Sequence, residues 1–377
     1  MNDYLNIAAF LEPVVIDELI GDDLFKQDQL GSVIEKFEES FPDLDHIDIV
    51  LIGCNEKRGS GIIGKELNNA NAIRKEIYQL FYWHQDIKIA DIGNIKKGKS
   101  YSDTIAALQM VIAELLNENK TVIILGGSHD ITTAQYNAYV QQQKLIHATV
   151  VDAVIDLDME SPYAKDNFLM PMLTGEPNFV QHYNHIAFQS YLVHPGMLVT
   201  LDKLKFDFYR VGHVKEDLDE MEPVLRNTHL MSFDINAIAY AFAPTNRTTP
   251  NGLTGEEACT LMQYAGLSTH LSTLGLYGYN QENDEHNITA KQISQMFWYF
   301  LDGRYKRLRE ASLDQQSEFN VFELMFSEVS TQFLQSKKTG RWWMRLSNNQ
   351  YIPCSYNDYL KAGRNEIPER WFRAQQR

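Results

Sequence analysis

Four side chains able to bind a divalent metal follow three short apolar segments of the sequence. His129 comes after "TVIIL" and two glycines, Asp152 and Asp156 follow "HATVV", and Asp234 follows "LMSF". Imidazole nitrogens and carboxylate oxygens are common ligands of divalent cations in proteins. Taken singly, each residue has a structural explanation as a helix cap or a solvated loop group. Together they predict a metal site, provided that the three segments are neighbouring strands of one sheet.

One residue beside these candidates departs from the expected pattern. The segment "SFDIN" has the spacing of a metal-binding Asp-x-Asp, but its second acid is replaced by the amide of Asn236. An amide offers one neutral carbonyl oxygen, which is a weaker ligand for a hard cation than a carboxylate. The sequence therefore raises the question of whether the metal site is complete.

The elements that would position these residues are short strands alternating with helices. Near-continuous apolar segments are typical of parallel strands covered on both faces. Between two of them, residues 102–120 show helical spacing of apolar residues, with Ser102 or Asp103 as the expected cap. We therefore predict an α/β fold with a mostly parallel sheet, whose sites lie beyond the carboxyl ends of the strands. The strand-like segments are 47–53, 86–93, 121–127, 147–152, 229–235 and 274–280.

The chain shows no repeat and no linker rich in Pro, Gly or Ser, which favours one α/β domain with elaborations at both ends. Residues 1–45 form an acidic lead-in, in which a helix is expected over 31–41. Residues 46–302 form the α/β core, and residues 303–377 form a C-terminal extension that packs on the core. The tryptophans expected to anchor this extension are Trp342, Trp343 and Trp371.

The composition excludes several classes of protein. The 377 residues carry a net charge of −16, which repels phosphate backbones and anionic membrane surfaces, so no nucleic-acid or membrane partner is predicted. No apolar run approaches the ~20 residues that span a bilayer, and a cytoplasmic location is the default expectation. The three cysteines lack the spacing of a zinc site or a disulfide framework.

The order of these motifs resembles that of the arginase, agmatinase and formimidoylglutamase family of ureohydrolases. The family signatures correspond to "GGSH", "DAVID" and "SFDIN", the last followed by a Pro loop and "NGLTGEE". The likeness covers roughly residues 47–302, and it is greatest for the formimidoylglutamase-like branch. It implies a three-layer α/β/α fold, and it implies assembly into a homo-oligomer.

The resemblance also implies a binuclear manganese centre, in which two ions activate a hydroxide for attack on an amidino or formimino carbon. One ion would be bound by His129, Asp152, Asp156 and Asp234, and all four are competent ligands. The other ion would share two of these aspartates and would need a histidine and an acid, where this chain has Val154 and Asn236. Valine has no lone pair to donate. We therefore predict a single remnant site, holding one manganese or other divalent ion or none.

Three further positions bear on the substrate. By resemblance, Glu257 matches the carboxylate that pairs with the substrate's amidino group, although an acid at a helix start also has a purely structural explanation. Phe242 stands where the formimidoylglutamase-like loop has an acid, and Gly278 stands where the last core strand has one.

Two hypotheses follow. In the first, the protein is formimidoylglutamase-like but catalytically impaired or inactive, with a binding or scaffolding role, and a pocket filled by Phe242 would support it. In the second, it is an active metal-dependent C–N hydrolase acting on formimidoylglutamate, agmatine or a related amidino compound. A histidine or carboxylate from a neighbouring loop would then have to replace the missing ligands. Nearby histidines are His182, His185 and His194.

Overall fold

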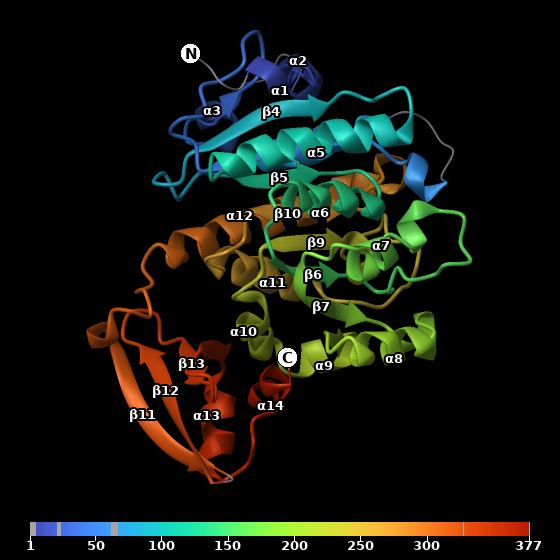
Figure 1. The fold of residues 1–377 in the computed structure, drawn as a ribbon. Helices are drawn as coiled ribbons and strands as arrows, with labels where there is room; N and C mark the ends of the chain where they lie inside the picture. Colours follow the sequence, from blue (N-terminus) through green and yellow to red (C-terminus); the bar gives the residue numbers. More distant parts are fainter. Residues whose placement is uncertain (1–4, 21–23, 62–66, 327, 377) are drawn as a thin grey trace.

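The computed structural model describes residues 5–20, 24–61, 67–326 and 328–376, and a large, mostly parallel sheet forms its centre (Figure 1). The strand order is β1-β4-β3-β5-β10-β9-β6-β7-β8, and β2 also pairs with β4. The short β1 is antiparallel to β4. The other pairs are parallel. The strands are β1 (Leu11–Glu12), β2 (Glu35–Lys36), β3 (Ile49–Gly53), β4 (Ile89–Ile95), β5 (Thr121–Leu125), β6 (Ile146–Val151), β7 (Val180–Phe188), β8 (Asp207–Arg210), β9 (Leu230–Asp234) and β10 (Thr273–Tyr277).

Helices cover both faces of this sheet, which confirms the predicted three-layer arrangement. One layer contains α4 (Asn69–Tyr78), α11 (Gly255–Leu267) and α12 (Ile288–Arg307). The opposite layer contains α5 (Tyr101–Asn117), α6 (Thr132–Gln141) and α7 (Leu169–Thr174). Between β7 and β9 the chain forms α8 (Pro195–Lys203), α9 (Val211–Glu216) and α10 (Met221–Leu225). Over the described ranges, no helix is long and apolar enough to cross a membrane.

The continuous apolar character of the strands follows from this sandwich. In β3, Ile49 and Leu51 pack with α4, α11 and α12, whereas Val50 and Ile52 pack with α5 and α6. All four side chains are fully buried. Because successive residues of a strand point to opposite faces, a sheet covered on both sides needs apolar residues at every position.

The start of α5 differs from the expected one. Ser100 caps the helix, since its hydroxyl accepts a hydrogen bond from the Asp103 backbone N–H at 3.2 Å. The Asp103 carboxylate accepts one in return from the Ser100 N–H at 2.8 Å. The two residues thus form a capping box, in which Asp103 is the third helical residue rather than the cap. The prediction of Ser102 or Asp103 as the cap is therefore wrong, because the reciprocal bonds of Ser100 and Asp103 start the helix two residues earlier.

The lead-in also differs from its prediction. The chain forms α1 (Leu5–Ala8), α2 (Ile16–Ile20) and a short α3 (Leu30–Val33), and then turns into β2 instead of continuing as a helix to residue 41. β2 pairs with β4, and the Phe37 N–H donates to the Asp91 carbonyl at 2.8 Å. Pairing with a formed sheet edge here outweighs the local helical pattern. Residues 1–4 and 21–23 of the predicted lead-in lie outside the described residues.

The C-terminal extension contains a second, antiparallel sheet beside α10 (Figure 1). Its strands are β11 (Phe319–Phe326), β12 (Val329–Ser336), β13 (Trp342–Arg345) and β14 (Tyr351–Cys354), followed by α13 (Tyr356–Gly363) and α14 (Glu369–Gln375). The three tryptophans are buried, Trp342 and Trp371 in one cluster of the extension and Trp343 in another.

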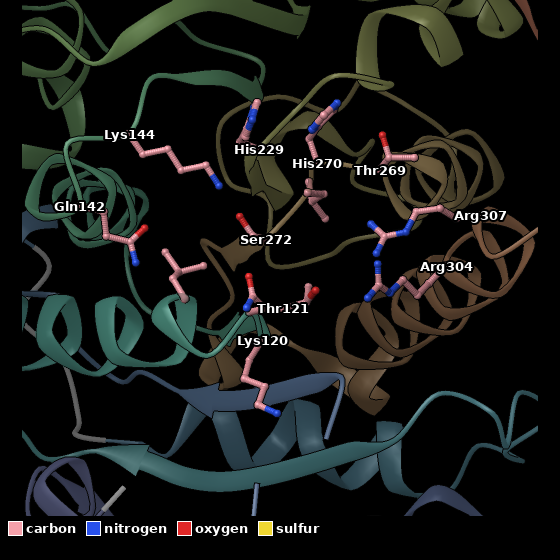
Figure 2. Close-up of a pocket in the computed structure, with 13 residues that line it drawn as sticks. Lys120, Thr121, Gln142, Lys144, His229, Thr269, His270, Ser272, Arg304 and Arg307 are labelled. Atoms are coloured by element: carbon pink, nitrogen blue, oxygen red, sulfur yellow. The ribbon is translucent and has the colours of Figure 1, made fainter. Parts of the chain in front are cut away.

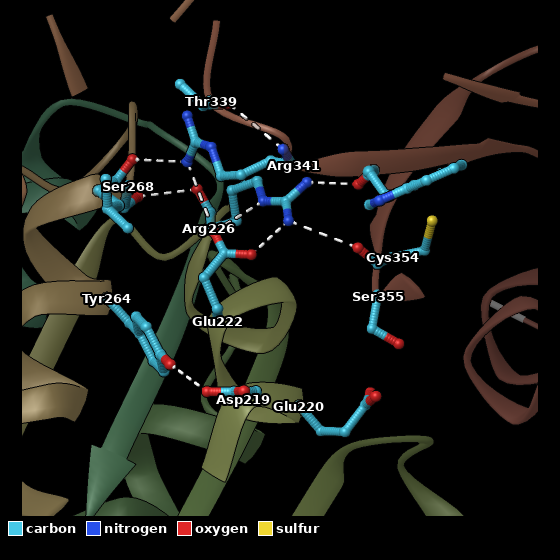
Figure 3. A network of polar contacts seen from close by, with 12 residues as sticks. Asp219, Glu220, Glu222, Arg226, Tyr264, Ser268, Thr339, Arg341, Cys354 and Ser355 are labelled. Atoms are coloured by element: carbon cyan, nitrogen blue, oxygen red, sulfur yellow. Dashed lines mark hydrogen bonds and ion pairs between the residues drawn. The ribbon is translucent and has the colours of Figure 1, made fainter. Parts of the chain in front are cut away.

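A buried polar network joins this extension to the core (Figure 3). Arg226, just after α10, donates from Nη1 to the Trp342 carbonyl at 2.5 Å and stacks its guanidinium 4.5 Å from the Trp343 ring centroid. Glu222 lies between Arg226 and Arg341 and is paired with both. Arg341 also reaches the Leu267 carbonyl at the end of α11, at 3.2 Å. The extension is therefore held by charge-assisted hydrogen bonds as well as by apolar packing.

Candidate metal centre

The loop after β5 places His129 over the carboxyl edge of the sheet. Gly126 and Gly127 have φ of +84° and +88°, a conformation that side chains disfavour, and they turn the chain sharply. The His129 Nε2 lies 3.0 Å from the Ser232 hydroxyl, which in turn lies 2.6 Å from the Thr132 hydroxyl. These contacts hold the ring so that Nδ1 faces the neighbouring strand ends.

Three carboxylates meet this nitrogen. The His129 Nδ1 lies 3.0 Å from Asp152, 2.9 Å from Asp156 and 3.8 Å from Asp234, measured to Oδ2 in each case. Asp152 follows β6 and Asp234 ends β9, which are adjacent strands, while β10 stands between β9 and β5. The structure thus brings together all four residues proposed for the first metal, and each is at most 5% exposed.

The donor set fits one divalent cation. Ligand atoms of His129, Asp152 and Asp234 lie within 4.8 Å of one another. Among the described residues, the His129 Nδ1 and the Asp156 Oδ2 have no hydrogen-bond partner, although both are buried. Their close approach is therefore not a well-directed hydrogen bond. Buried ligand atoms that converge on one point are what a cation site requires.

Burial governs the protonation of the cluster. It raises the pKa of Asp234 to about 7, with a further contribution from the neighbouring Asp152. Burial also raises the pKa of Asp152 and of Asp156, and the nearby imidazole opposes the shift in both. For His129, burial alone would lower the pKa, but the carboxylates of Asp152 and Asp156 outweigh it and hold the pKa well above its usual value. Without a metal, a protonated imidazole therefore balances part of the negative charge.

The positions of the second metal offer neither of the expected ligands. Val154 contributes an aliphatic side chain, and its backbone N–H lies 3.4 Å from the Asp152 Oδ1. The same oxygen accepts a hydrogen bond from the Ala153 N–H at 2.6 Å. The backbone N–H of Asn236, rather than its side-chain amide, donates to the Asp234 Oδ1 at 2.8 Å. Asp152 and Asp234, which a second ion would share, thus direct their Oδ2 atoms toward His129. Their Oδ1 atoms accept hydrogen bonds from the backbone.

Gly278 follows β10 and lies against the same carboxylate. Its φ is +81°, and a β-carbon at this position would stand 2.7 Å from the Asp234 Oδ1. The resemblance places an acid here, but in this backbone even a methyl group would press on Asp234. A longer acidic side chain would therefore fit here only if Asp234 or the backbone moved.

Two residues of the site carry no sequence signal by which they could have been predicted. The Phe168 ring packs edge-on against the His129 ring, with centroids 4.8 Å apart, and shields it from solvent. Lys165 pairs with Asp166 at 2.5 Å, and its positive charge also favours ionisation of Asp156 and Asp234. Both lie in the loop between β6 and α7, whose approach to the sheet edge depends on the tertiary fold.

The candidate replacement histidines lie elsewhere or behind the cluster. His185 is buried, with Nε2 3.2 Å from the Asp152 backbone carbonyl and Nδ1 2.8 Å from the Tyr183 hydroxyl. Burial lowers its pKa to about 3, so it is neutral. His182 contacts Asp207 at the amino end of β8, and His194 caps α8. None of these three histidines directs a ring nitrogen at the carboxylate cluster.

Glu257 is engaged in a helix cap. Its carboxylate accepts a hydrogen bond from the Thr254 N–H at 2.7 Å, and the Thr254 hydroxyl accepts one from the Glu257 N–H at 3.2 Å. Lys215 forms an ion pair with the same carboxylate at 2.9 Å. Burial would raise the pKa of Glu257, but these partners outweigh it and lower the pKa. Phe242 is 39% exposed, so it does not fill a buried pocket.

Comparisons with known proteins agree with this architecture. No curated protein matches the chain. Formiminoglutamase from Trypanosoma cruzi, solved with manganese, superposes with a TM-score of 0.65 at 16% identity, over 74% of this chain and 99% of that one. Formimidoylglutamase from Bacillus subtilis gives 0.65 at 16% identity, over 76% and 95%. Proclavaminate amidino hydrolase from Streptomyces clavuligerus gives 0.61 at 18% identity, over 75% and 98%.

These structures share the fold of this chain, with a mostly parallel sheet between two helical layers. The Arginase family model matches residues 47–302, a span that begins just before β3 and ends within α12. It includes His129, the three aspartates and Glu257. The chain therefore belongs to the arginase family.

Proposed function

We propose that this protein is a formimidoylglutamase-like member of the arginase family whose metal centre holds at most one divalent cation and which lacks two-metal amidine hydrolysis. Its role would be to bind or scaffold rather than to turn over a substrate. The observation that carries the proposal is the contrast between the two halves of the centre. His129, Asp152, Asp156 and Asp234 converge, whereas Val154 and Asn236 supply neither the imidazole nor the carboxylate that a second ion would need.

A single ion in this cradle would be held by the His129 Nδ1 and by carboxylate oxygens of Asp152, Asp156 and Asp234. A bound divalent cation supplies Lewis-acid polarisation and lowers the pKa of coordinated water. The chain itself keeps the site dry, through Phe168 over the imidazole, and provides positive charge from Lys165. The raised pKa of Asp234 fits a cluster that shares protons when no metal is bound.

The expected ligand class is a small amidino or formimino compound, and Glu257 is its proposed partner. A cationic amidino group is matched by a carboxylate that accepts two parallel hydrogen bonds. Here the group would have to displace the Lys215 ammonium, which already neutralises Glu257. This competition favours weak binding at Glu257.

One observation favours the alternative function, an active hydrolase. The complete ligand set for one metal is buried, close-packed and supported by the contact between His129 and the Ser232 hydroxyl. Four converging ligands are enough to hold one catalytic cation. A one-metal enzyme acting on formimidoylglutamate, agmatine or a related amidino compound would use it directly.

The test is a metal count on the wild-type protein. After loading with Mn²⁺ and desalting, elemental analysis gives ions per chain, and the same sample is assayed for urea, formamide and ammonia release from amidino and formimino compounds. One ion or none without turnover is the expected result. Two ions, or turnover at any stoichiometry, would overturn the proposal and establish the hydrolase.

A further inference from the structure

A polar cavity lies at the amino ends of the sheet strands, opposite to the metal centre (Figure 2). Its volume is about 220 Å³. Thr121 begins β5, His229 precedes β9 and Ser272 precedes β10, so the cavity is bounded by the amino ends of three adjacent strands. The exposed Lys144 and His270 leave it open to solvent. It is separate from the His129 cluster, which lies beyond the carboxyl ends of the same strands.

The charge of this cavity is opposite to that of the protein. Four of its lining residues are cationic, Lys120, Lys144, Arg304 and Arg307, and no Asp or Glu belongs to its described lining. The chain as a whole carries a net charge of −16. A concentration of positive charge in an acidic protein attracts anions selectively to that place.

Two of these cations already have structural partners. Lys120 donates to the Asp45 backbone carbonyl at 3.2 Å, and in Figure 2 its ammonium points away from the middle of the cavity. Arg307 donates from Nη1 to the Ser268 carbonyl, just past the end of α11, at 2.5 Å. The helix dipole also favours a cation at the end of α11. These hydrogen bonds account for the Lys120 ammonium and for one nitrogen of Arg307.

Arg304 is not explained in this way. Its Nη1 is buried and, among the described residues, has no hydrogen-bond partner. Burial lowers the pKa of this guanidinium, while the negative charge of Asp48 opposes the shift. Figure 2 shows the guanidinium groups of Arg304 and Arg307 side by side, facing the middle of the cavity from α12. Two adjacent guanidinium groups repel each other, and a buried N–H without a partner loses its hydrogen bond to water. An anion between these guanidinium groups and the opposite wall of the cavity would remove both costs.

The opposite wall supplies further donors. The Lys144 ammonium reaches in from beyond α6, and the Ser272 hydroxyl lies between it and the arginines (Figure 2). The His229 Nδ1 accepts a hydrogen bond from the His147 N–H at 3.2 Å, so its neutral ring carries the proton on Nε2. The rings of His229 and His270 stack at 5.0 Å. The Ser272 hydroxyl is shared with the Tyr139 hydroxyl at 2.7 Å, so the Lys144 ammonium is the charged donor of this wall. An ammonium group facing two guanidinium groups is an arrangement that binds a tetrahedral oxyanion.

We infer that this cavity binds a phosphate group, either free phosphate or the phosphoryl end of a small phosphoester, between Arg304 and Arg307 on one side and Lys144 on the other. The volume accommodates such a group with a short organic tail. Guanidinium groups match its oxygens in pairs, and no carboxylate of the described lining competes for them inside the cavity. The site is independent of the proposed loss of hydrolysis, because it shares no residue with the metal centre.

The experiment is calorimetric titration of the full-length protein at constant ionic strength, with a chelator present so that phosphate bound to metal does not contribute. The ligands are inorganic phosphate, glycerol phosphate and citrate. Phosphate or glycerol phosphate should bind at one site per chain, and the comparison of the two identifies the source. Lys144→Gln and Arg304→Gln should each weaken this binding about tenfold or more.

Arg309→Gln is the matched control. Arg309 lies just beyond α12, is exposed and stacks on Tyr305 outside the cavity, so the variant makes the same charge change without touching the site. It should bind phosphate like the wild type. Lys144 is exposed, so its variant keeps the test valid even if Arg304→Gln folds poorly. Absence of phosphate and phosphoester binding, tighter binding of citrate, or equal weakening by Arg309→Gln would overturn the inference.

Discussion

At the residue scale, the metal centre differs from a binuclear one at two side chains. Val154→His combined with Asn236→Asp should add the missing donors and raise the Mn²⁺ bound per chain by about one ion, because carboxylate and imidazole bind such cations more strongly than an amide or an alkyl group does. Elemental analysis after desalting measures the change. Val154→Leu with Asn236→Ala alters the same positions without adding a ligand and should leave the metal content unchanged. An unaltered metal content in the first variant would show that these positions do not face a second ion.

His129 has a second role, as the counter-charge of the buried carboxylates. His129→Gln leaves Asp152 and Asp156 without their imidazolium, and in metal-free protein it should lower the free energy of unfolding by roughly 3–5 kcal/mol, as expected when a buried ion pair loses one partner. Urea denaturation at pH 7 measures this loss. Combining it with Asp156→Asn should recover part of the stability. A single variant as stable as wild type would mean that the carboxylates are already protonated.

A substitution at Gly278 tests how much stability is lost through crowding of Asp234 and how much through backbone strain. Gly278→Ala should destabilise the protein by about 1–3 kcal/mol, since it combines a positive φ with a β-carbon 2.7 Å from the carboxylate. Gly340 has a φ of +74°, and a β-carbon added there would meet no atom within 4 Å, so Gly340→Ala measures the effect of strain alone. Thermal unfolding of both variants gives the comparison. Equal losses would show that Asp234 moves aside at no cost.

At the element scale, the docking of the C-terminal extension should depend on pH. Burial would raise the pKa of Glu222, but Arg226 and Arg341 outweigh it and hold the pKa below its usual value. A depressed folded-state pKa contributes stability above the unfolded pKa of about 4.3, and this contribution is lost as pH falls through the lower folded value. We expect acid to release the extension, with a change in tryptophan fluorescence.

Glu222→Gln provides the control for that titration. The amide cannot ionise, so the variant should be less stable than the wild type at neutral pH and should lose less stability between neutral pH and pH 3. If the two proteins show the same dependence on pH, then other carboxylates control the docking. Glu310, whose pKa is also lowered in part by Arg341, is the next candidate.

The core strands could be predicted from the sequence because their residues are mostly buried and therefore mostly apolar. A strand covered on both faces is apolar throughout, so segments such as 121–127 are recognisable without the fold. The candidate site followed from the strand ends and from family motifs. By contrast, Lys165 and Phe168 reach the site from a loop, and residues 31–41 depend on an edge formed by β4, which local patterns do not encode.

At the scale of the whole molecule, membership of the arginase family leads us to expect a homo-oligomer. We predict a solution mass of two or more times the 43.5 kDa of one chain, measured by light scattering after size-exclusion chromatography. Repeating the measurement over a range of protein concentrations distinguishes stable assembly from weak association. A mass of 43.5 kDa at all concentrations would contradict the prediction.

The position of β10 governs when the metal centre can form during synthesis. β10 lies between β5 and β9 and is parallel to both, so it joins the strands that carry His129 to those that carry the three aspartates. It is also the last strand of this sheet to leave the ribosome, about 150 residues after β5. Until it arrives, two part-sheets must each present an open edge. The aspartates of β6 and β9 can meet earlier, but His129 joins them only once β10 has been made, so the metal centre is completed late. The two open edges that wait for β10 are the places where mispairing is expected.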